Sequence, residues 1–566
     1  MSDAEGGVLD EFLEEIDRTV FLFGALLTVG VILAFFLSPS TVENGISSLN
    51  SSMLSAFNWA LLLIVFLVVV FLLFLIVGPW GSIKLGDSSP EYSFLSFFAM
   101  LYSAGFAAGV VFWGPTEALF YYANPSPLFE NVQGGSAEAM TVAVQQTLFH
   151  WALPQLAVFT IMGIAIGYFA YNYENVPLRV SSALTPIIGA DNLDGPFAKV
   201  IDILAVFATI GGVATSLGFI GSQFITGLDY QWGISMGNLG ILLVVTFMTL
   251  LFTTSMVLGV DKGIRRLSNF NMILFVVLML ATFVAGPTLF LILLGTQAFA
   301  GMIDDFVMMS LFTGAGPFGS GNPTATNWMN TWTVFYWAWA LSWSPFAGLF
   351  IARISKGRTV REVAFTGIVA TSGATIPWFT FVGGTAVWAQ HNGIADFSEV
   401  ISGNVGPEVA GFILFEALQF TLNVGGSSVT IPIGTVLMYM FLILVTTFFV
   451  TSADSSTLAV SMMTTGGKAR PSTINRIFWG VVLGLTAAIL MILGGTGSAN
   501  TLQQAAIITG TPFAFVCFLA MLSLIKDFGS NYGRVLLQDE TVLFGASRKS
   551  EPEPPGAGGT AESDDD

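Results

Sequence analysis

The sequence predicts an all-α membrane protein with twelve transmembrane helices. Of its 566 residues, 54% are hydrophobic and only 10% are charged, and the mean hydropathy is +0.78. A soluble domain has about a quarter of its residues charged, so most of this chain is expected to face lipid. The apolar residues also gather in segments of the length that a bilayer requires.

The apolar segments follow one another through nearly the whole chain. They cover residues 20–37, 57–77, 94–122, 143–168, 201–226, 236–258, 272–294, 332–351, 363–388, 431–462, 477–493 and 502–524. Two further stretches, 294–312 and 397–420, mix Asp or Glu with apolar residues and are expected to lie at the membrane surface. The chain thus divides into an acidic cytoplasmic N-terminal segment (1–19), a transmembrane domain (20–526) and an acidic cytoplasmic tail (527–566), expected to be disordered from residue 550.

The basic residues indicate the orientation of the helices. With the N-terminus inside and twelve crossings, all 18 Lys and Arg residues fall on one side, and the opposite loops 38–55, 123–140 and 227–235 contain none. Lys and Arg are retained in cytoplasmic loops, so both termini of a multi-pass cell-membrane protein are expected in the cytoplasm. The net charge of −18 argues against a nucleic-acid partner.

The eighth segment contains an unusual sequence, WTVFYWAWALSWSPF, followed by a basic cluster. Trp339 and Trp343 lie one helical turn apart, and Pro345 lacks a backbone donor, so the helix is expected to break there. Such a break is tolerated where it lines a cavity or meets protein. Indole faces attract diffuse organic cations, and the segment therefore predicts a transporter of methylated onium compounds.

The third segment, MLYSAGFAAGVVFWGPTEALFYY, is rich in small residues. Gly105, Gly109 and Gly114 allow either close helix packing or local unwinding. Glu117 is costly in a membrane unless it has a partner or faces water. Because the third and eighth segments are five apart, two broken helices at these places favour a five-helix unit repeated with inverted topology.

The tenth segment ends in FFVTSADSS. The hydroxyls of Thr451 and Ser452, together with carbonyls of an unwound neighbour, would form the neutral oxygen cage that an alkali cation requires. Alternatively, these hydroxyls bond back to carbonyls of their own helix.

In these segments the chain resembles the betaine/choline/carnitine transporter family. The similarity covers about residues 15 to 525 and is carried by FWGPTEA, FHWALPQ, ATIGGVATSLG, FFVTSADS and the WTVFYWAW…SWSPF segment with FIARISKGRTVRE. The resemblance implies two leading helices followed by a five-plus-five inverted repeat of the leucine-transporter type, commonly as a trimer. It also implies secondary transport of betaine-like solutes, often driven by sodium.

The resemblance further implies a set of site residues. The aromatic substrate box of the family falls on Trp151, Leu156, Phe159, Trp339, Ala340 and Trp343, where three of the six positions keep a Trp. One sodium site would use the carbonyls of Ser103, Phe106 and Phe448 with the hydroxyls of Thr451 and Ser452. A second sodium site would use Thr209 and Phe346, but Val213 stands where the family has a second threonine.

The predicted function is secondary active uptake of a quaternary ammonium or related onium solute, with sodium as the coupling ion. The alternatives are a sodium-coupled amino-acid transporter of the same fold and a sodium-independent onium exchanger. His150 is either a structural residue or a proton carrier. No nucleophile, metal-hydrolase pattern or P-loop is visible, so neither an enzyme nor a cofactor is expected.

Overall fold

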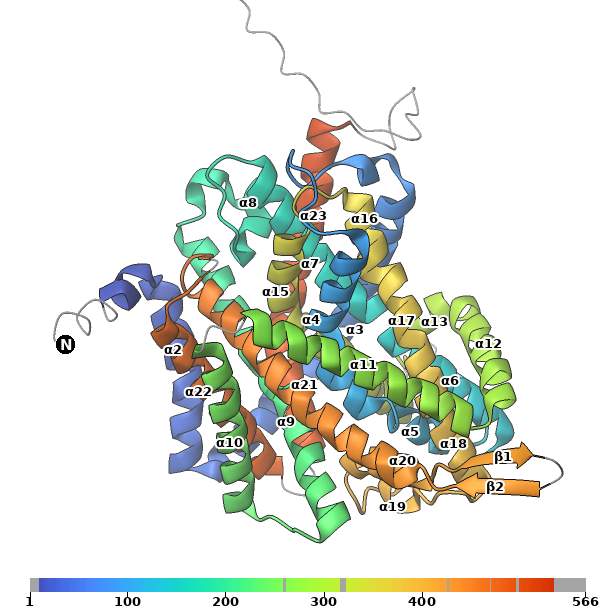
Figure 1. Ribbon diagram of the computed structural model, residues 1–566. Helices are drawn as coiled ribbons and strands as arrows, with labels where there is room; N and C mark the ends of the chain where they lie inside the picture. Colours follow the sequence, from blue (N-terminus) through green and yellow to red (C-terminus); the bar gives the residue numbers. More distant parts are fainter. Residues whose placement is uncertain are drawn as a thin grey trace, which may run out of the picture.

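The computed structural model describes residues 10–257, 261–315, 322–424, 427–468, 470–494 and 498–533. Each of the twelve predicted segments contains a helix (Figure 1). Nine described helical segments are long and apolar enough to cross a membrane, and a pair bent by 109° makes a tenth. Helices α4 and α10 supply the remaining two. The predicted disordered tail from residue 550 lies outside the described residues.

The spans and the main elements that connect them follow one another along the chain. Helices α2 (Arg18–Leu37) and α3 (Pro39–Val77) lead, and the first half follows with α4 (Phe94–Trp113), α5 (Glu117–Ala123), α6 (Ala137–Trp151), α7 (Leu153–Asn172), α8 (Thr185–Ile188), α9 (Pro196–Trp232), α10 (Asn238–Val257), α11 (Asp261–Ala285), α12 (Thr288–Asp304) and α13 (Phe306–Leu311). The second half contains α14 (Pro323–Met329), the π-helix η5 (Asn330–Val334), α15 (Phe335–Ile354), α16 (Val360–Ala364), η6 (Phe365–Ala370), α17 (Thr371–Trp378), η7 (Phe379–Gly383), α18 (Gly384–His391), α19 (Ser398–Ile401), α20 (Ala410–Ala417), β1 (Phe420–Val424), β2 (Ser427–Ile431), α21 (Gly434–Met463), α22 (Thr473–Gly494) and α23 (Ser498–Asn531).

The packing partners of the helices repeat with a shift of five spans. Helix α9, the fifth span, packs against α15, α22 and α23, whereas α21, the tenth, packs against α4, α10 and α11. Each partner of α21 precedes the corresponding partner of α9 by five spans. A shift by an odd number of spans reverses the direction of crossing, so the two halves are related by inversion. This is the predicted five-plus-five arrangement behind two leading helices.

The predicted helix break in the eighth span is wrong. Helix α15 runs through Pro345 without interruption. Proline leaves the carbonyl four residues earlier without its helical donor, and here Ser344 Oγ donates to Leu341 O at 2.8 Å. The adjacent serine therefore satisfies the carbonyl that Pro345 frees.

The third span is broken, as predicted, and so is the fourth. Helix α4 is continuous through the glycine-rich stretch and ends at Trp113, and α5 begins at Glu117 after Gly114, Pro115 and Thr116. The fourth span breaks at Ala152, whose φ of −94° and ψ of −127° are not helical. Pro154, in the first turn of α7, fits a helix start. The two breaks place Glu117 and Trp151 at helix ends.

The two predicted surface stretches differ from each other. Stretch 294–312 falls on α12 and α13, and α12 turns by 109° from α11. Stretch 397–420 contains the short helices α19 and α20 with the 3-10 helix η8 (Pro407–Val409) between them, and the antiparallel hairpin β1–β2 follows, with Phe420 opposite Ile431. The hairpin projects from the bundle in Figure 1. Two glycines between β-branched runs are a hairpin signal that the all-α expectation overlooked.

Candidate functional site

Three buried indoles from two helices form the centre of the candidate site. Trp151 ends α6, and Trp339 and Trp343 lie on α15. The Trp151 and Trp339 rings meet edge to face, with centroids 6.0 Å apart and planes at 90°. The exposed fractions of Trp151, Trp339 and Trp343 are 1%, 3% and 7%. The structure therefore brings together Trp151 and Trp339, which the sequence separates by almost two hundred residues, with Trp343 one turn away on α15.

One serine on α9 fixes both indoles of α15. Ser216 Oγ accepts from Trp339 Nε1 at 3.2 Å and from Trp343 Nε1 at 3.1 Å, and it donates to Gly212 O at 3.1 Å. A hydroxyl has one proton and two acceptor positions, so all of them are used. The two indole planes are held in orientation by a single side chain.

Glycine on α4 makes room for the indole pair. A Cβ atom at Gly109 would lie 2.5 Å from Trp339 Cη2 and 2.7 Å from Trp151 Cη2. These distances are shorter than any real contact of a Cβ atom. Gly109 therefore allows α4 to approach both rings, which gives this glycine a packing role rather than an unwinding one.

The other three positions of the predicted box are buried but contribute one ring among them. Leu156 and Phe159 lie on α7, which packs against α15, and Ala340 follows Trp339. Their exposed fractions are 1%, 3% and 1%. The side chains of Leu156 and Ala340 present aliphatic surface at these buried positions.

Four rings that the sequence analysis did not single out surround the indoles. Phe335 stacks on Trp339 at 5.5 Å and 12°, and Phe379 of η7 stacks on Trp151 at 4.8 Å and 26°. Phe219 and Tyr336 also contact Trp339, at 5.5 and 6.3 Å. One face of each of Trp151 and Trp339 is thus covered by a stacked ring. Phe335 and Trp339 are four residues apart, a helical spacing that could have identified the stack.

Glu117 is the partner of His150 that sequence reasoning missed. Glu117 Oε1 lies 2.9 Å from His150 Nδ1 and accepts from Tyr121 Oη at 2.9 Å. Glu117 Oε2 accepts from Tyr336 Oη at 2.7 Å and from Trp151 Nε1. Glu117 and His150 are both fully buried. The expensive acid of the third span therefore has four hydrogen-bond partners, one of them an indole of the candidate site.

The residues of the predicted first sodium site lie on α4 and α21. Thr451 Oγ1 lies 3.1 Å from Thr447 O and 3.3 Å from Phe448 O, both in its own helix, and it accepts from Asn271 Nδ2 of α11 at 3.2 Å. Ser103 and Phe106 lie within the continuous helix α4, where backbone carbonyls accept helical hydrogen bonds. The side chains of residues 103–108 are outside the described part of the chain. In this conformation, the Thr451 hydroxyl is bonded within its helix, as the alternative reading of the sequence has it.

The residues of the predicted second sodium site are buried on α9 and α15. Thr209 Oγ1 lies 3.8 Å from Met463 Sδ, and Phe346 packs against Trp343 with centroids 5.5 Å apart. Val213 is buried and has no oxygen in its side chain. Thr215 Oγ1, a possible substitute, donates to Leu502 O at 3.0 Å.

Comparisons with known proteins agree on one family. The family model for betaine/carnitine/choline family transporters (BCCT) matches residues 19–532. The glycine betaine transporter OpuD of Bacillus subtilis strain 168 is 37% identical over 511 residues, covering 90% of this chain and 94% of its own. Glycine betaine transporter 1 of Vibrio parahaemolyticus is 33% identical, covering 90% and 93%, and the ectoine/hydroxyectoine transporter of Virgibacillus pantothenticus is 34% identical, covering 83% and 88%.

Proposed function

We propose that this chain, which belongs to the betaine/carnitine/choline family of transporters, carries a betaine-like quaternary ammonium or related onium solute into the cell. Transport would be secondary active, by alternating access in the cell membrane, with both termini cytoplasmic and the chain assembled as a homotrimer. Two of the relatives are named as glycine betaine transporters, and glycine betaine is the first solute to test. As members of a transporter family, such proteins are not enzymes.

The observation that supports this substrate class is the indole group of Trp151, Trp339 and Trp343. All three indole N–H groups are satisfied by Glu117 or Ser216, so a ligand would meet ring faces rather than donors. Each cation–π contact with a desolvated onium group contributes about 0.5–2 kcal/mol. A transporter for ordinary amino acids would gain little from such a group.

Sodium coupling is the favoured energy source, with Thr451 and Ser452 as side-chain ligands and the carbonyls of Ser103, Phe106 and Phe448 completing the cage. Thr451 and Asn271 bring two side-chain polar groups to the α11–α21 interface. A sodium-independent exchanger is the second candidate, because the helical carbonyls of α4 and the back-bonded Thr451 hydroxyl would have to be released before a cation could bind. Val213 at the second site also favours fewer coupling ions.

Purified protein in vesicles separates these candidates. Uptake of labelled glycine betaine is measured with an inward sodium gradient, with potassium in place of sodium, and with vesicles preloaded with unlabelled solute. Symport requires uptake into empty vesicles that depends on the sodium gradient, whereas exchange requires preloading and ignores sodium. If neither condition gives uptake of glycine betaine or of a panel of onium solutes, the proposed substrate class is wrong.

Trp343→Leu should raise the half-saturating solute concentration strongly and Trp343→Phe mildly, because only the latter keeps a ring.

A further inference from the structure

A buried carboxylate lies directly behind the indole group. Glu117 opens α5 just after the break of the third span, and Trp151 closes α6 at the break of the fourth. Tyr336, the third residue of this set, comes from α15. All three side chains are at most 1% exposed. One carboxylate therefore links the ends of two broken helices to the helix that carries Trp339 and Trp343.

The partners of Glu117 suit the charged form of the side chain. An ionised carboxylate only accepts hydrogen bonds, and the indole of Trp151 only donates. The hydroxyls of Tyr121 and Tyr336 both lie at donor distance, 2.9 and 2.7 Å. His150 completes the set through Nδ1, while its Nε2 lies 3.0 Å from Thr333 Oγ1 and 3.2 Å from Gln146 Nε2.

The described part of the chain gives Glu117 no permanently charged counter-ion. Within it, the only basic group at ion-pair distance from this carboxylate is His150, and every Lys or Arg ion pair involves another acid. An uncompensated charge at membrane depth is expensive and marks a functional site. A cationic ligand next to Trp151 would supply the missing positive charge.

We infer that Glu117 is the fixed counter-charge of the substrate site, a positioning residue that orients the Trp151 indole and makes the site prefer an onium head over a neutral group of the same shape. The inference rests on the proposed function. It adds a residue outside the six positions of the aromatic box.

Two physical effects would produce this preference. The carboxylate at the indole N–H polarises the hydrogen-bonded ring, which strengthens the attraction of its face for a cation. The negative charge also acts directly on an onium group across the width of the ring, and in a protein interior such an interaction changes affinity by on the order of tenfold. Neither effect acts on an uncharged tert-butyl group.

A purely structural role for Glu117 makes a different prediction. If the carboxylate only ties α5, α6 and α15 together, its loss should weaken every ligand to the same degree. Glycine betaine and tert-butylacetate separate the two roles, because the second replaces the ammonium nitrogen by carbon and otherwise has the same shape and carboxylate.

The experiment measures the dissociation constants of both compounds by calorimetry for detergent-purified wild type and Glu117→Gln. We expect Glu117→Gln to weaken glycine betaine by about tenfold or more and to leave tert-butylacetate unchanged or tighter, since the amide removes an acid that repels this anion. His150→Gln is the matched control, because it alters the same network and keeps the charge, and it should preserve the ratio of the two constants. An equal loss for both ligands in Glu117→Gln would overturn the inference.

Two further outcomes remain interpretable. If wild type binds no glycine betaine, the same comparison is made with an onium solute of the panel that it does bind and with the analogue of that solute in which carbon replaces the onium atom. If wild type binds no onium solute, the proposed function is wrong and the inference falls with it. If Glu117→Gln is not monodisperse, His150→Lys neutralises the same carboxylate by another route and should lower the preference for glycine betaine in the same way. An unchanged preference in a folded His150→Lys protein would also overturn the inference.

Discussion

Ser216 is the residue on which the orientation of two indoles depends. Its hydroxyl accepts hydrogen bonds from both Trp339 Nε1 and Trp343 Nε1. We predict that Ser216→Ala leaves two buried donors unsatisfied, at about 1–3 kcal/mol each. The half-saturating onium concentration should rise about tenfold or more as the rings lose their fixed planes.

Ser222 provides the control for this change. It lies on the same helix and is also buried, but its hydroxyl donates to Phe219 O at 2.8 Å within the helix. Ser222→Ala should leave solute binding within about twofold, since helix back-bonding contributes little. Equal titration curves for wild type and Ser216→Ala would show that the indoles do not need this anchor.

Gly109 is the second residue-scale test. Gly109→Ala would force its methyl group into both Trp339 and Trp151, and overpacking of this kind costs about 1–3 kcal/mol. We predict a lower thermal midpoint and loss of solute binding. Gly373→Ala is the matched control, because a Cβ atom there meets nothing within 4 Å. Retained binding by Gly109→Ala would contradict the close approach of α4 to the rings.

The sequence predicts the site residues unevenly. The spacing of Trp339 and Trp343 indicates one helical face, and that pair is confirmed as neighbours. The Glu117–His150 contact joins residues 33 apart in sequence. It depends on the break of the third span, which Gly114 and Pro115 indicate, and on the break of the fourth span at Ala152, which was not predicted. Phe379 is more distant still in the sequence from its partner Trp151. It reaches Trp151 only because the ninth span packs beside the fourth.

At the scale of elements, single residues mislead about helix breaks. Pro345 is a sequence signal for a break, but Ser344 supplies the missing donor to Leu341 O and the helix continues. The actual breaks lie at Gly114–Thr116 and at Ala152. Ala152 carries no sequence signal of its own, and only the following Pro154 indicates a helix start. The existence of the helices and the break of the third span were therefore predictable, whereas the break of the fourth span and the continuity of the eighth were not.

The interface of α4 and α21 carries the prediction on energy coupling. Replacing Thr451 and Ser452 together by Ala removes two oxygens from a dry cation site, and each unsatisfied polar interaction there costs about 1–3 kcal/mol. We predict that sodium no longer stimulates uptake, while membrane insertion is unchanged. The control is Thr446→Ala, because the Thr446 hydroxyl, on the same helix, donates to Leu442 O within that helix. If sodium still stimulates uptake by the double variant, the ion binds at another place in the protein.

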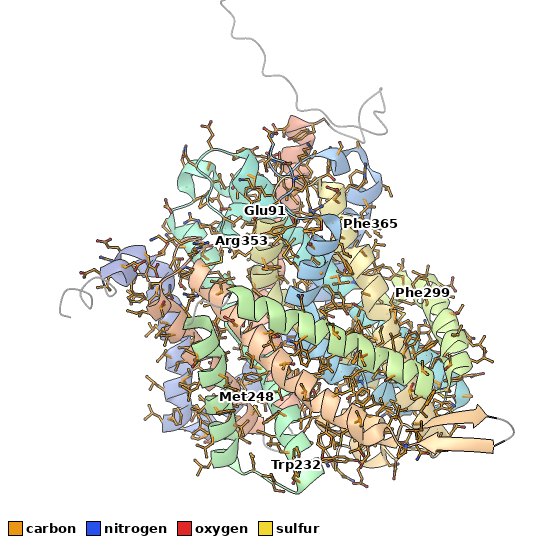
Figure 2. The ribbon with its side chains drawn as sticks, viewed as in Figure 1. Glu91, Trp232, Met248, Phe299, Arg353 and Phe365 are labelled. Atoms are coloured by element: carbon orange, nitrogen blue, oxygen red, sulfur yellow. The ribbon has the colours of Figure 1, made fainter. Side chains whose placement is uncertain are left out.

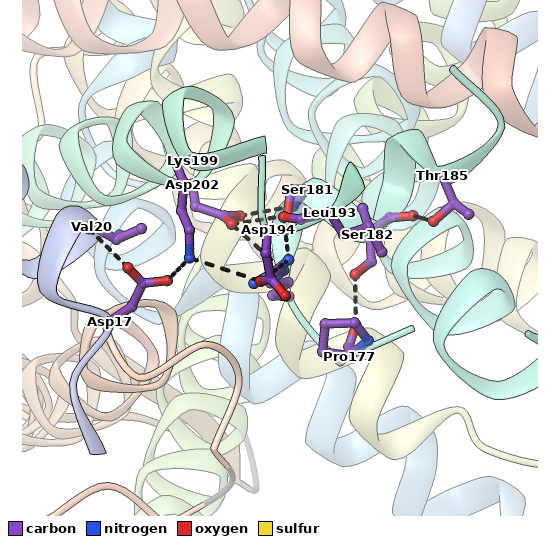
Figure 3. Close-up of polar contacts among 11 residues, drawn as sticks. Asp17, Val20, Pro177, Ser181, Ser182, Thr185, Leu193, Asp194, Lys199 and Asp202 are labelled. Atoms are coloured by element: carbon purple, nitrogen blue, oxygen red, sulfur yellow. Dashed lines mark hydrogen bonds and ion pairs between the residues drawn. The ribbon is translucent and has the colours of Figure 1, made fainter. Parts of the chain in front are cut away.

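At the scale of the whole molecule, one end of the bundle is tied together by a polar cluster (Figure 3). Lys199 Nζ binds Asp17 and lies 3.9 Å from Asp194, and Arg179 Nη2 binds Asp194 at 3.0 Å. Glu15 accepts from Ser472 N at 2.8 Å. The cluster joins the N-terminal segment to the start of α9 and to the loop before α22.

We predict that Lys199→Met loosens the N-terminal segment. A partly exposed ion pair contributes about 0.2–1 kcal/mol, so amide exchange in residues 10–17 should rise up to about fivefold, and high salt should have the same effect on wild type. Lys356→Met is the control, since Lys356 lies over the Tyr171 ring at 5.5 Å without an ion pair in the described residues. Unchanged exchange in Lys199→Met would show that other contacts, such as that of Glu15, hold the segment.

The prediction of orientation depends on the basic residues, which are absent from the loops 38–55, 123–140 and 227–235. Figure 2 shows Glu91 and Arg353 toward one end and Trp232 at the other. The end with Arg353 also holds the polar cluster of Lys199 and Arg179, and retention of basic loops predicts that it faces the cytoplasm.

The single cysteine, Cys517, is buried, so introduced cysteines can be labelled on a native background. We predict that Lys356→Cys reacts with an impermeant maleimide only after cells are permeabilised. Gly45→Cys, at an exposed position in the 38–55 stretch without basic residues, should react in intact cells. The opposite labelling pattern would show that the protein has the reverse orientation in the membrane, with the polar cluster on the extracellular side.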